Sequence, residues 1–91
     1  MMHAHLIVQG RVQGVGFRAT AQQIAGKYNI TGWVRNQSDG SVEIEAEGSD
    51  KNLESFIQAM KKGPSTFAKV ENVKVEKSEQ EQGFQSFEVK Y

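Results

Sequence analysis

The sequence predicts an α+β fold in which two helices cover one face of a mostly antiparallel sheet. Apolar residues alternate with period two in four segments and recur with helical period in two others, in the order β-α-β-β-α-β with a short extra C-terminal strand. The chain has 91 residues, which is the size of one ordinary domain, and no stretch has the composition of a linker. We therefore expect residues 1–91 to form a single domain with the ferredoxin-like α/β sandwich fold.

The first three elements follow from the spacing of apolar residues. Residues 4–12 alternate between apolar and polar positions, as in a strand with one buried face. A helix is predicted next, because apolar side chains recur on one helical face at Ala21, Ile24, Ala25 and Tyr28. Asn29 is a suitable stop for that helix, and residues 30–36 have the β-branched and aromatic composition of a second strand.

A hairpin and a second helix are predicted in the middle of the chain. Residues 38–40, Ser-Asp-Gly, form a turn that tolerates positive φ. The returning strand, residues 41–47, alternates so regularly that we expect its apolar residues to face the core and its acidic residues to face solvent, namely Glu43, Glu45 and Glu47. The second helix starts from a cap at Ser49 or Asp50 and ends at residues 61–64, Lys-Lys-Gly-Pro.

Two further strands complete the predicted fold. Residues 68–76 form a strand whose apolar phase slips between Val70 and Val73, which indicates a β-bulge, and residues 84–91 form a short closing strand. Strands one and two are joined by a crossover helix and therefore run parallel. The loop after strand one and the end of strand two are thus expected at the same edge of the sheet.

Composition excludes several classes of function. The 11 Lys and Arg residues balance the 11 Asp and Glu residues, so no net positive charge attracts a nucleic acid. The absence of cysteine excludes disulfides, thiolate catalysis and cysteine-based metal sites. No window approaches a membrane span of about 20 apolar residues, and residues 1–5 lack the character of a secretory signal. We expect a cytoplasmic monomer without a nucleic-acid or membrane partner.

Residues 10–18, with the sequence GRVQGVGFR, carry most of the chemical information. The segment joins a strand to the start of a helix, where unpaired N–H groups and the helix dipole favour an anion. Its glycines let backbone amides approach a ligand closely, and Arg18 supplies a planar fork of donors suited to a phosphoryl group. The alternative is a glycine-rich turn followed by a solvated arginine.

Two nucleotide-binding motifs resemble this segment and are rejected. Residues 14–19 match the dinucleotide pattern G-x-G-x-x-A, but the chain is too short for the additional βα units of that fold. The acidic residue at the required distance, Asp39, also lies in a hairpin turn instead of at a strand end. A Walker A loop is excluded because no Gly-Lys-Ser/Thr follows the glycines.

A second candidate segment is residues 32–36, Gly-Trp-Val-Arg-Asn, at the end of strand two. Asn36 is explained equally by turn chemistry leading into residues 38–40. If it shares an edge with the glycine loop, its amide can instead hydrogen-bond a phosphoryl oxygen and an adjacent water. Trp33 is interpreted as a packing residue.

The two segments together closely resemble the acylphosphatase family, and the resemblance covers nearly the whole chain. It is carried by residues 12–18, 32–36, 39–43 and 63–64. The family fold is the ferredoxin-like sandwich. The resemblance implies hydrolysis of the carboxyl–phosphate bond of a small acyl phosphate, with no metal and no other cofactor.

The resemblance also implies roles for particular residues. Arg18 is similar to the family's catalytic, phosphate-binding arginine, and Asn36 to the asparagine that positions the attacking water. The backbone amides that bind the phosphate would be those of Gln13, Gly14, Val15, Gly16, Phe17 and Arg18. Many members carry a hydroxyl residue three positions after the arginine, where this sequence has Ala21, next to Thr20.

Such a sparse site suits the chemistry, because an acyl phosphate has a good leaving group and phosphoryl transfer depends mainly on positioning and charge stabilisation. No general base is evident, since Asp39 and Glu43 are interpreted as turn and outer-face residues. His3 and His5 share a strand face and could be metal ligands. Without an identifiable third ligand, we interpret both histidines as surface residues.

Two other functions are compatible with the predicted fold. One is a non-catalytic ligand-binding or regulatory domain, against which the joint presence of Arg18 and Asn36 argues. The other is an RNA-binding module with the same element order. The balanced charge and the lack of a basic and aromatic pattern on the sheet argue against RNA.

Overall fold

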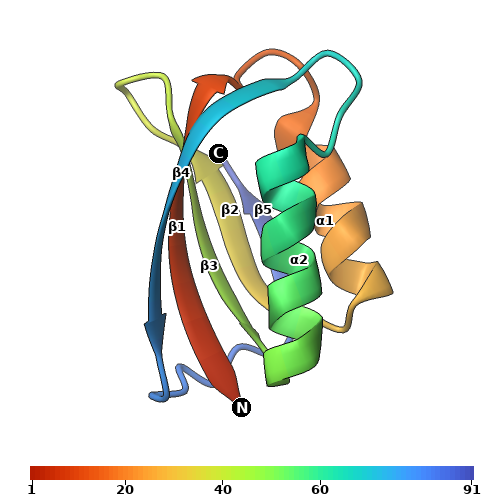
Figure 1. Cartoon of the computed structure of the whole chain (residues 1–91), viewed down its shortest axis with the longest axis vertical. Coiled ribbons are helices and arrows are strands. Elements are labelled where there is room, and N and C mark those ends of the chain that lie inside the picture. Colours follow the sequence, from red (N-terminus) through yellow and green to blue (C-terminus); the bar gives the residue numbers. More distant parts are fainter.

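The computed structural model describes residues 1–91 and has the predicted order of elements (Figure 1). The helices and strands are β1 (Met2–Arg11), α1 (Phe17–Lys27), β2 (Thr31–Asn36), β3 (Val42–Gly48), α2 (Asp50–Lys62), β4 (Lys69–Ser78) and β5 (Phe87–Lys90). The five strands form one sheet in the order β4-β1-β3-β2-β5. Every neighbouring pair is antiparallel except β2 and β5, which are parallel. The predicted ferredoxin-like sandwich with an added terminal strand is confirmed.

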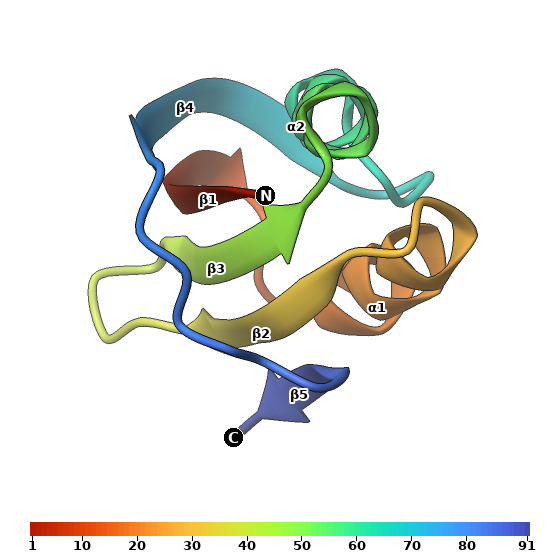
Figure 2. The same ribbon diagram turned by 90° about the horizontal axis from the view of Figure 1, so that it is seen from below.

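Both helices pack on one face of the sheet, and the core lies between the two layers (Figure 2). The apolar faces that the alternation predicts are buried, with Leu6, Val8, Val42 and Ile44 fully inaccessible. The helix ends also agree with the predictions. Asn29, two residues past the end of α1, adopts a φ of 55°, and the Oγ of Ser49 accepts a hydrogen bond from the N–H of Asn52 at 3.2 Å.

Strand directions bring the predicted site segments to one end of the sheet. β1 and β2 each pair antiparallel with β3, so they run in the same direction, and β5 runs parallel to β2. The end of β1, the end of β2 and the C-terminus therefore lie toward the same end of the molecule (Figure 1). The predicted bulge is confirmed: Gln9 pairs with Asn72 and Gly10 with Val70, which leaves Glu71 as the extra residue.

The face of the sheet opposite the helices corrects two predictions. The acidic residues of β3 do not all face solvent, because Glu47 is only 3% exposed. His3 is not a surface residue either, since it is 6% exposed. The reason is the segment of residues 79–86, which connects the two edge strands, β4 and β5, and therefore crosses this face (Figure 2).

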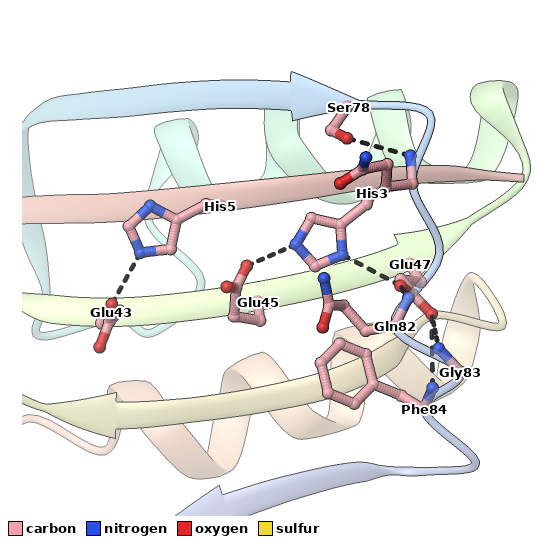
Figure 3. Close-up of polar contacts among 10 residues, drawn as sticks. His3, His5, Glu43, Glu45, Glu47, Ser78, Gln82, Gly83 and Phe84 are labelled. Carbon is pink, nitrogen blue, oxygen red and sulfur yellow. Dashed lines mark hydrogen bonds and ion pairs between the residues drawn. The ribbon is translucent and has the colours of Figure 1, made fainter.

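Glu47 anchors this crossing segment, as Figure 3 shows. Its carboxylate accepts hydrogen bonds from the backbone N–H groups of residues 82–84 and contacts Nδ1 of His3 at 3.1 Å. The ring of His3 stacks on Phe84 with centroids 6.1 Å apart. Alternation along β3 places Glu47 on the outer face correctly, but only the path of residues 79–86 determines that this position is buried.

The other ring nitrogens on this face also contact carboxylates. Nε2 of His3 lies 2.7 Å from Glu45 and Nε2 of His5 lies 2.7 Å from Glu43 (Figure 3). No group of three or more histidine or acidic side chains has the arrangement of a metal site. Neither helix has the length and apolar character needed to span a membrane.

Candidate active site

The loop between β1 and α1 presents a row of free backbone donors. Gly14 and Gly16 adopt positive φ values of 72° and 77°, so the chain turns into α1 through a conformation that favours glycine. The N–H groups of residues 13–19 donate no hydrogen bond within the protein. Since α1 begins at Phe17, these donors combine loop amides with the first turn of a helix, which is a favourable site for an anion.

Arg18 lies in the first turn of α1, beside this loop. Its Nη1 donates a hydrogen bond to the carbonyl oxygen of Lys90 at 2.9 Å. Its guanidinium also lies over the ring of Tyr91, 4.6 Å from the centroid. Both contacts come from the C-terminal end of the chain, so β5 orients the arginine side chain.

Asn36 ends β2 and lies in the same cavity as the loop. The cavity has a volume of about 260 Å³, and its lining includes Gly14, Gly16, Arg18 and Asn36. The Oδ1 atom of Asn36 is buried and has no hydrogen-bond partner. A buried amide oxygen without a partner is uncommon in folded proteins, and its occurrence in a residue that lines a cavity beside Arg18 is typical of a group that binds a ligand or water.

The cavity contains residues that sequence reasoning assigned to other places or did not consider. Gln22, Val89 and Tyr91 also line it. Gln22 is one helical turn beyond Arg18, so helical spacing could have indicated it. Val89 and Tyr91 reach the cavity only because β5 lies parallel beside β2, and this pairing has no local sequence signal.

The residues considered as general bases are engaged elsewhere. Hydrogen bonds from the hydroxyl and the backbone N–H of Ser41 hold the pKa of Asp39 below its ordinary value. Glu43 pairs with Arg35 at 2.7 Å and with His5 on the outer face of the sheet. Their interpretation as turn and outer-face residues is confirmed. Trp33 is half-buried, and the cations of Arg35 and Lys90 lie over its ring.

The fold and the cavity together define a class of protein. It is a small α+β sandwich whose first strand turns into its first helix through a loop of unpaired N–H groups, an arrangement suited to binding a phosphoryl group. The arginine gives the site a permanent positive charge, and the asparagine gives it a neutral group able to accept from a water. Such a site is suited to phosphoryl-transfer chemistry.

Comparisons with known proteins place the chain within this class. The family model described as Acylphosphatase matches residues 4–89. An acylphosphatase of Bacillus licheniformis is 52% identical over 91 residues, covering all of both chains. The crystal structure of acylphosphatase from Bacillus subtilis superimposes with a TM-score of 0.96 at 46% identity, covering all of both chains. An acylphosphatase structure from Coxiella burnetii gives a TM-score of 0.90 at 35% identity, covering 98% of this chain and 92% of that one.

The chain belongs to the acylphosphatase family. Members of this family are hydrolases that act on an acid anhydride, the carboxyl–phosphate bond of acyl phosphates. The resemblance stated from the sequence motifs is therefore confirmed over nearly the full length of the chain.

Proposed function

We propose that this protein hydrolyses small acyl phosphates without a metal ion, using Arg18 and Asn36 as its catalytic residues. One observation carries the assignment of these residues. Asn36, whose buried Oδ1 has no hydrogen-bond partner, lines the same cavity as Arg18 and the glycine loop. A phosphoryl-binding surface and a polar group able to hold a nucleophile thus lie side by side.

In the proposed reaction, the phosphoryl oxygens accept hydrogen bonds from the backbone N–H groups of residues 13–18 and from Arg18. A water donates a hydrogen bond to Asn36 and attacks phosphorus. The bond between phosphorus and the bridging oxygen breaks, the carboxylate leaves with the bond's electron pair, and the water's protons pass to solvent and phosphate. Because the carboxylate is a good leaving group, positioning and charge stabilisation are the main tasks of the protein.

We extend the proposal to the state of the protein in the cell. Residues 1–91 act as a single acylphosphatase domain, as a cytoplasmic monomer that needs neither a cofactor nor a nucleic acid. The outer sheet face argues against RNA binding, because residues 79–86 cross it and Glu43, Glu45 and Glu47 lie on it. This face is crowded, and its carboxylates are paired with His3, His5 and Arg35, so it offers no open platform for stacking bases.

The direct test is release of phosphate from acetyl or benzoyl phosphate by the purified protein, with a stable phosphomonoester as the control substrate. Turnover of the acyl phosphate should survive exhaustive chelation, and inorganic phosphate should inhibit competitively. A loss of activity that a divalent cation restores would overturn the metal-free mechanism. Phosphate-induced chemical-shift changes that miss residues 13–18 would place the site elsewhere.

A further inference from the structure

The side chain of Gln13 joins the phosphate loop to the β2–β3 hairpin. Gln13 is half-buried, and its Nε2 donates hydrogen bonds to the carbonyl oxygens of Gln37 at 2.7 Å and of Ser41 at 2.8 Å. Both N–H hydrogens of the Gln13 amide group are thus donated to the short loop between β2 and β3. Gln37 directly follows Asn36, so this contact is one residue away from the proposed water-binding group.

The hairpin loop also has its own internal hydrogen bonds. The N–H of Gln37 donates to the carbonyl of Ser41 at 2.9 Å, and the N–H of Gly40 donates to the carbonyl of Gln37 at 3.2 Å. The hydroxyl oxygen of buried Ser41 also lies 2.9 Å from Oε1 of Gln37. The loop is therefore closed without Gln13, whose amide fixes where the loop sits against the phosphate-binding segment.

We propose that the Gln13 side chain is a positioning residue, which holds Asn36 at a fixed place relative to the phosphate loop through the carbonyls of Gln37 and Ser41. This inference rests on the proposed function, in which Asn36 orients the attacking water. In the proposed function the backbone N–H of Gln13 binds the phosphoryl group, and its side chain hydrogen-bonds the hairpin. One residue thus links the two halves of the site. No group in the protein donates a hydrogen bond to the amide oxygen of Asn36, so the position of its backbone matters for where this oxygen lies.

The substitution Gln13→Met separates these two roles of residue 13. It keeps the length of the side chain and the backbone N–H, and it removes both donors. We expect kcat to fall by about 10- to 100-fold, because small displacements of a reacting group cost rate in this range. The inhibition constant of inorganic phosphate should stay within about twofold of wild type, since the backbone donors are retained.

The matched control is Gln58→Met, which makes the same change on the exposed face of α2, where the side chain of Gln58 donates a hydrogen bond to Glu54 at 3.2 Å. Its kcat should equal that of wild type. The thermal midpoint of each variant shows that the protein is folded at the assay temperature. If Gln13→Met is unfolded there, Gln13→Asn takes its place, because its amide is too short to reach both carbonyls.

A double-mutant cycle with Asn36→Ala decides whether Gln13 acts through Asn36. In the Asn36→Ala background, Gln13→Met should lower kcat by less than about twofold. An equal loss in both backgrounds, a wild-type kcat for Gln13→Met, or a loss of phosphate affinity that accounts for the whole effect would overturn the inference and leave the proposed function intact. A wild-type kcat for Asn36→Ala alone would overturn both.

Discussion

Arg18 is the residue whose surroundings say most about how the site works. Its guanidinium is anchored by the Lys90 carbonyl and by the face of Tyr91. These contacts use only part of the planar fork of five donors, so the remaining N–H groups are available to a phosphoryl group. A side chain that is already oriented loses less conformational entropy when the ligand binds.

Replacing Arg18 by Ala should weaken phosphate binding and lower kcat by about 10³-fold, because the charge acts in both the ground state and the transition state. Arg18→Lys should restore little activity, since an ammonium group keeps the charge and loses the bidentate geometry. The measurements are kcat and the phosphate inhibition constant. Near wild-type kinetics for the lysine variant would show that charge alone is sufficient.

Replacing Asn36 by Ala should have a different kinetic signature. We expect kcat to fall by about 10²-fold with little change in phosphate affinity, because orientation of the water matters mainly as the transition state forms. Thermal midpoints should remain close to wild type, since the Oδ1 atom makes no hydrogen bond that the variant could lose. If lost activity merely follows a lost fold, Asn36 is a turn residue and has no role in catalysis.

The terminal strand β5 is an edge strand of the sheet, and its C-terminal end reaches the site. Tyr91 follows it and covers one side of Arg18. Tyr91→Ala should weaken phosphate inhibition by about two- to fivefold, as expected for the loss of one cation–π contact. Tyr91→Phe keeps the aromatic face and should behave as wild type, so an equal effect of both changes would assign the role to the phenolic oxygen.

Strands and helices were predictable here because each has a clear period and strong end signals. Ser49 and Asn29 are examples, since the residues that begin and end a helix act through local contacts and can therefore be recognised in the sequence. The site segments were predictable for a related reason. Topology alone places the glycine loop and Asn36 at the same edge, once the crossover helix makes β1 and β2 parallel.

The missed features all depend on contacts between distant parts of the chain. Nothing near Glu47 in the sequence shows that residues 82–84 return to cover it. The strand with which β5 pairs cannot be predicted from the sequence either, because a four-residue strand fits any sheet edge. The Gln13 contacts with the hairpin depend on side-chain placement across 24 and 28 positions.

Stability of the protein as a single unit should depend on the ionised state of Glu47. Burial alone would raise the pKa of this carboxyl and is the largest single influence. Hydrogen bonds from the N–H of Gln82, from His3 and from two further backbone groups together outweigh it and hold the pKa below its ordinary value of 4.5. A group with a lowered pKa binds its proton less readily in the folded state, so its contribution is present above the ordinary value and is lost as the pH falls through the folded value.

We therefore expect the free energy of unfolding to decrease as the pH falls below the ordinary carboxyl pKa of 4.5. Glu47→Gln should destabilise the protein by about 1–3 kcal/mol at pH 7, the usual loss for hydrogen bonds to a charged group, and should flatten this acid dependence. Urea unfolding at several pH values measures both effects. Glu76→Gln, on exposed β4, is the control, and an equally flattened profile for that variant would rule out the assignment to Glu47.

The direction of the strands also determines how the protein responds to mechanical force. β1 and β5 point the same way, so Met1 and Tyr91 lie toward opposite ends of the sheet (Figure 1). A load applied between these two residues acts along the strands, and many inter-strand hydrogen bonds resist it together. The same load applied between Met2 and Gly48, which are paired neighbours at one end, would open β1 from β3 one pair at a time. The protein should therefore be mechanically strong along one axis and weak along another.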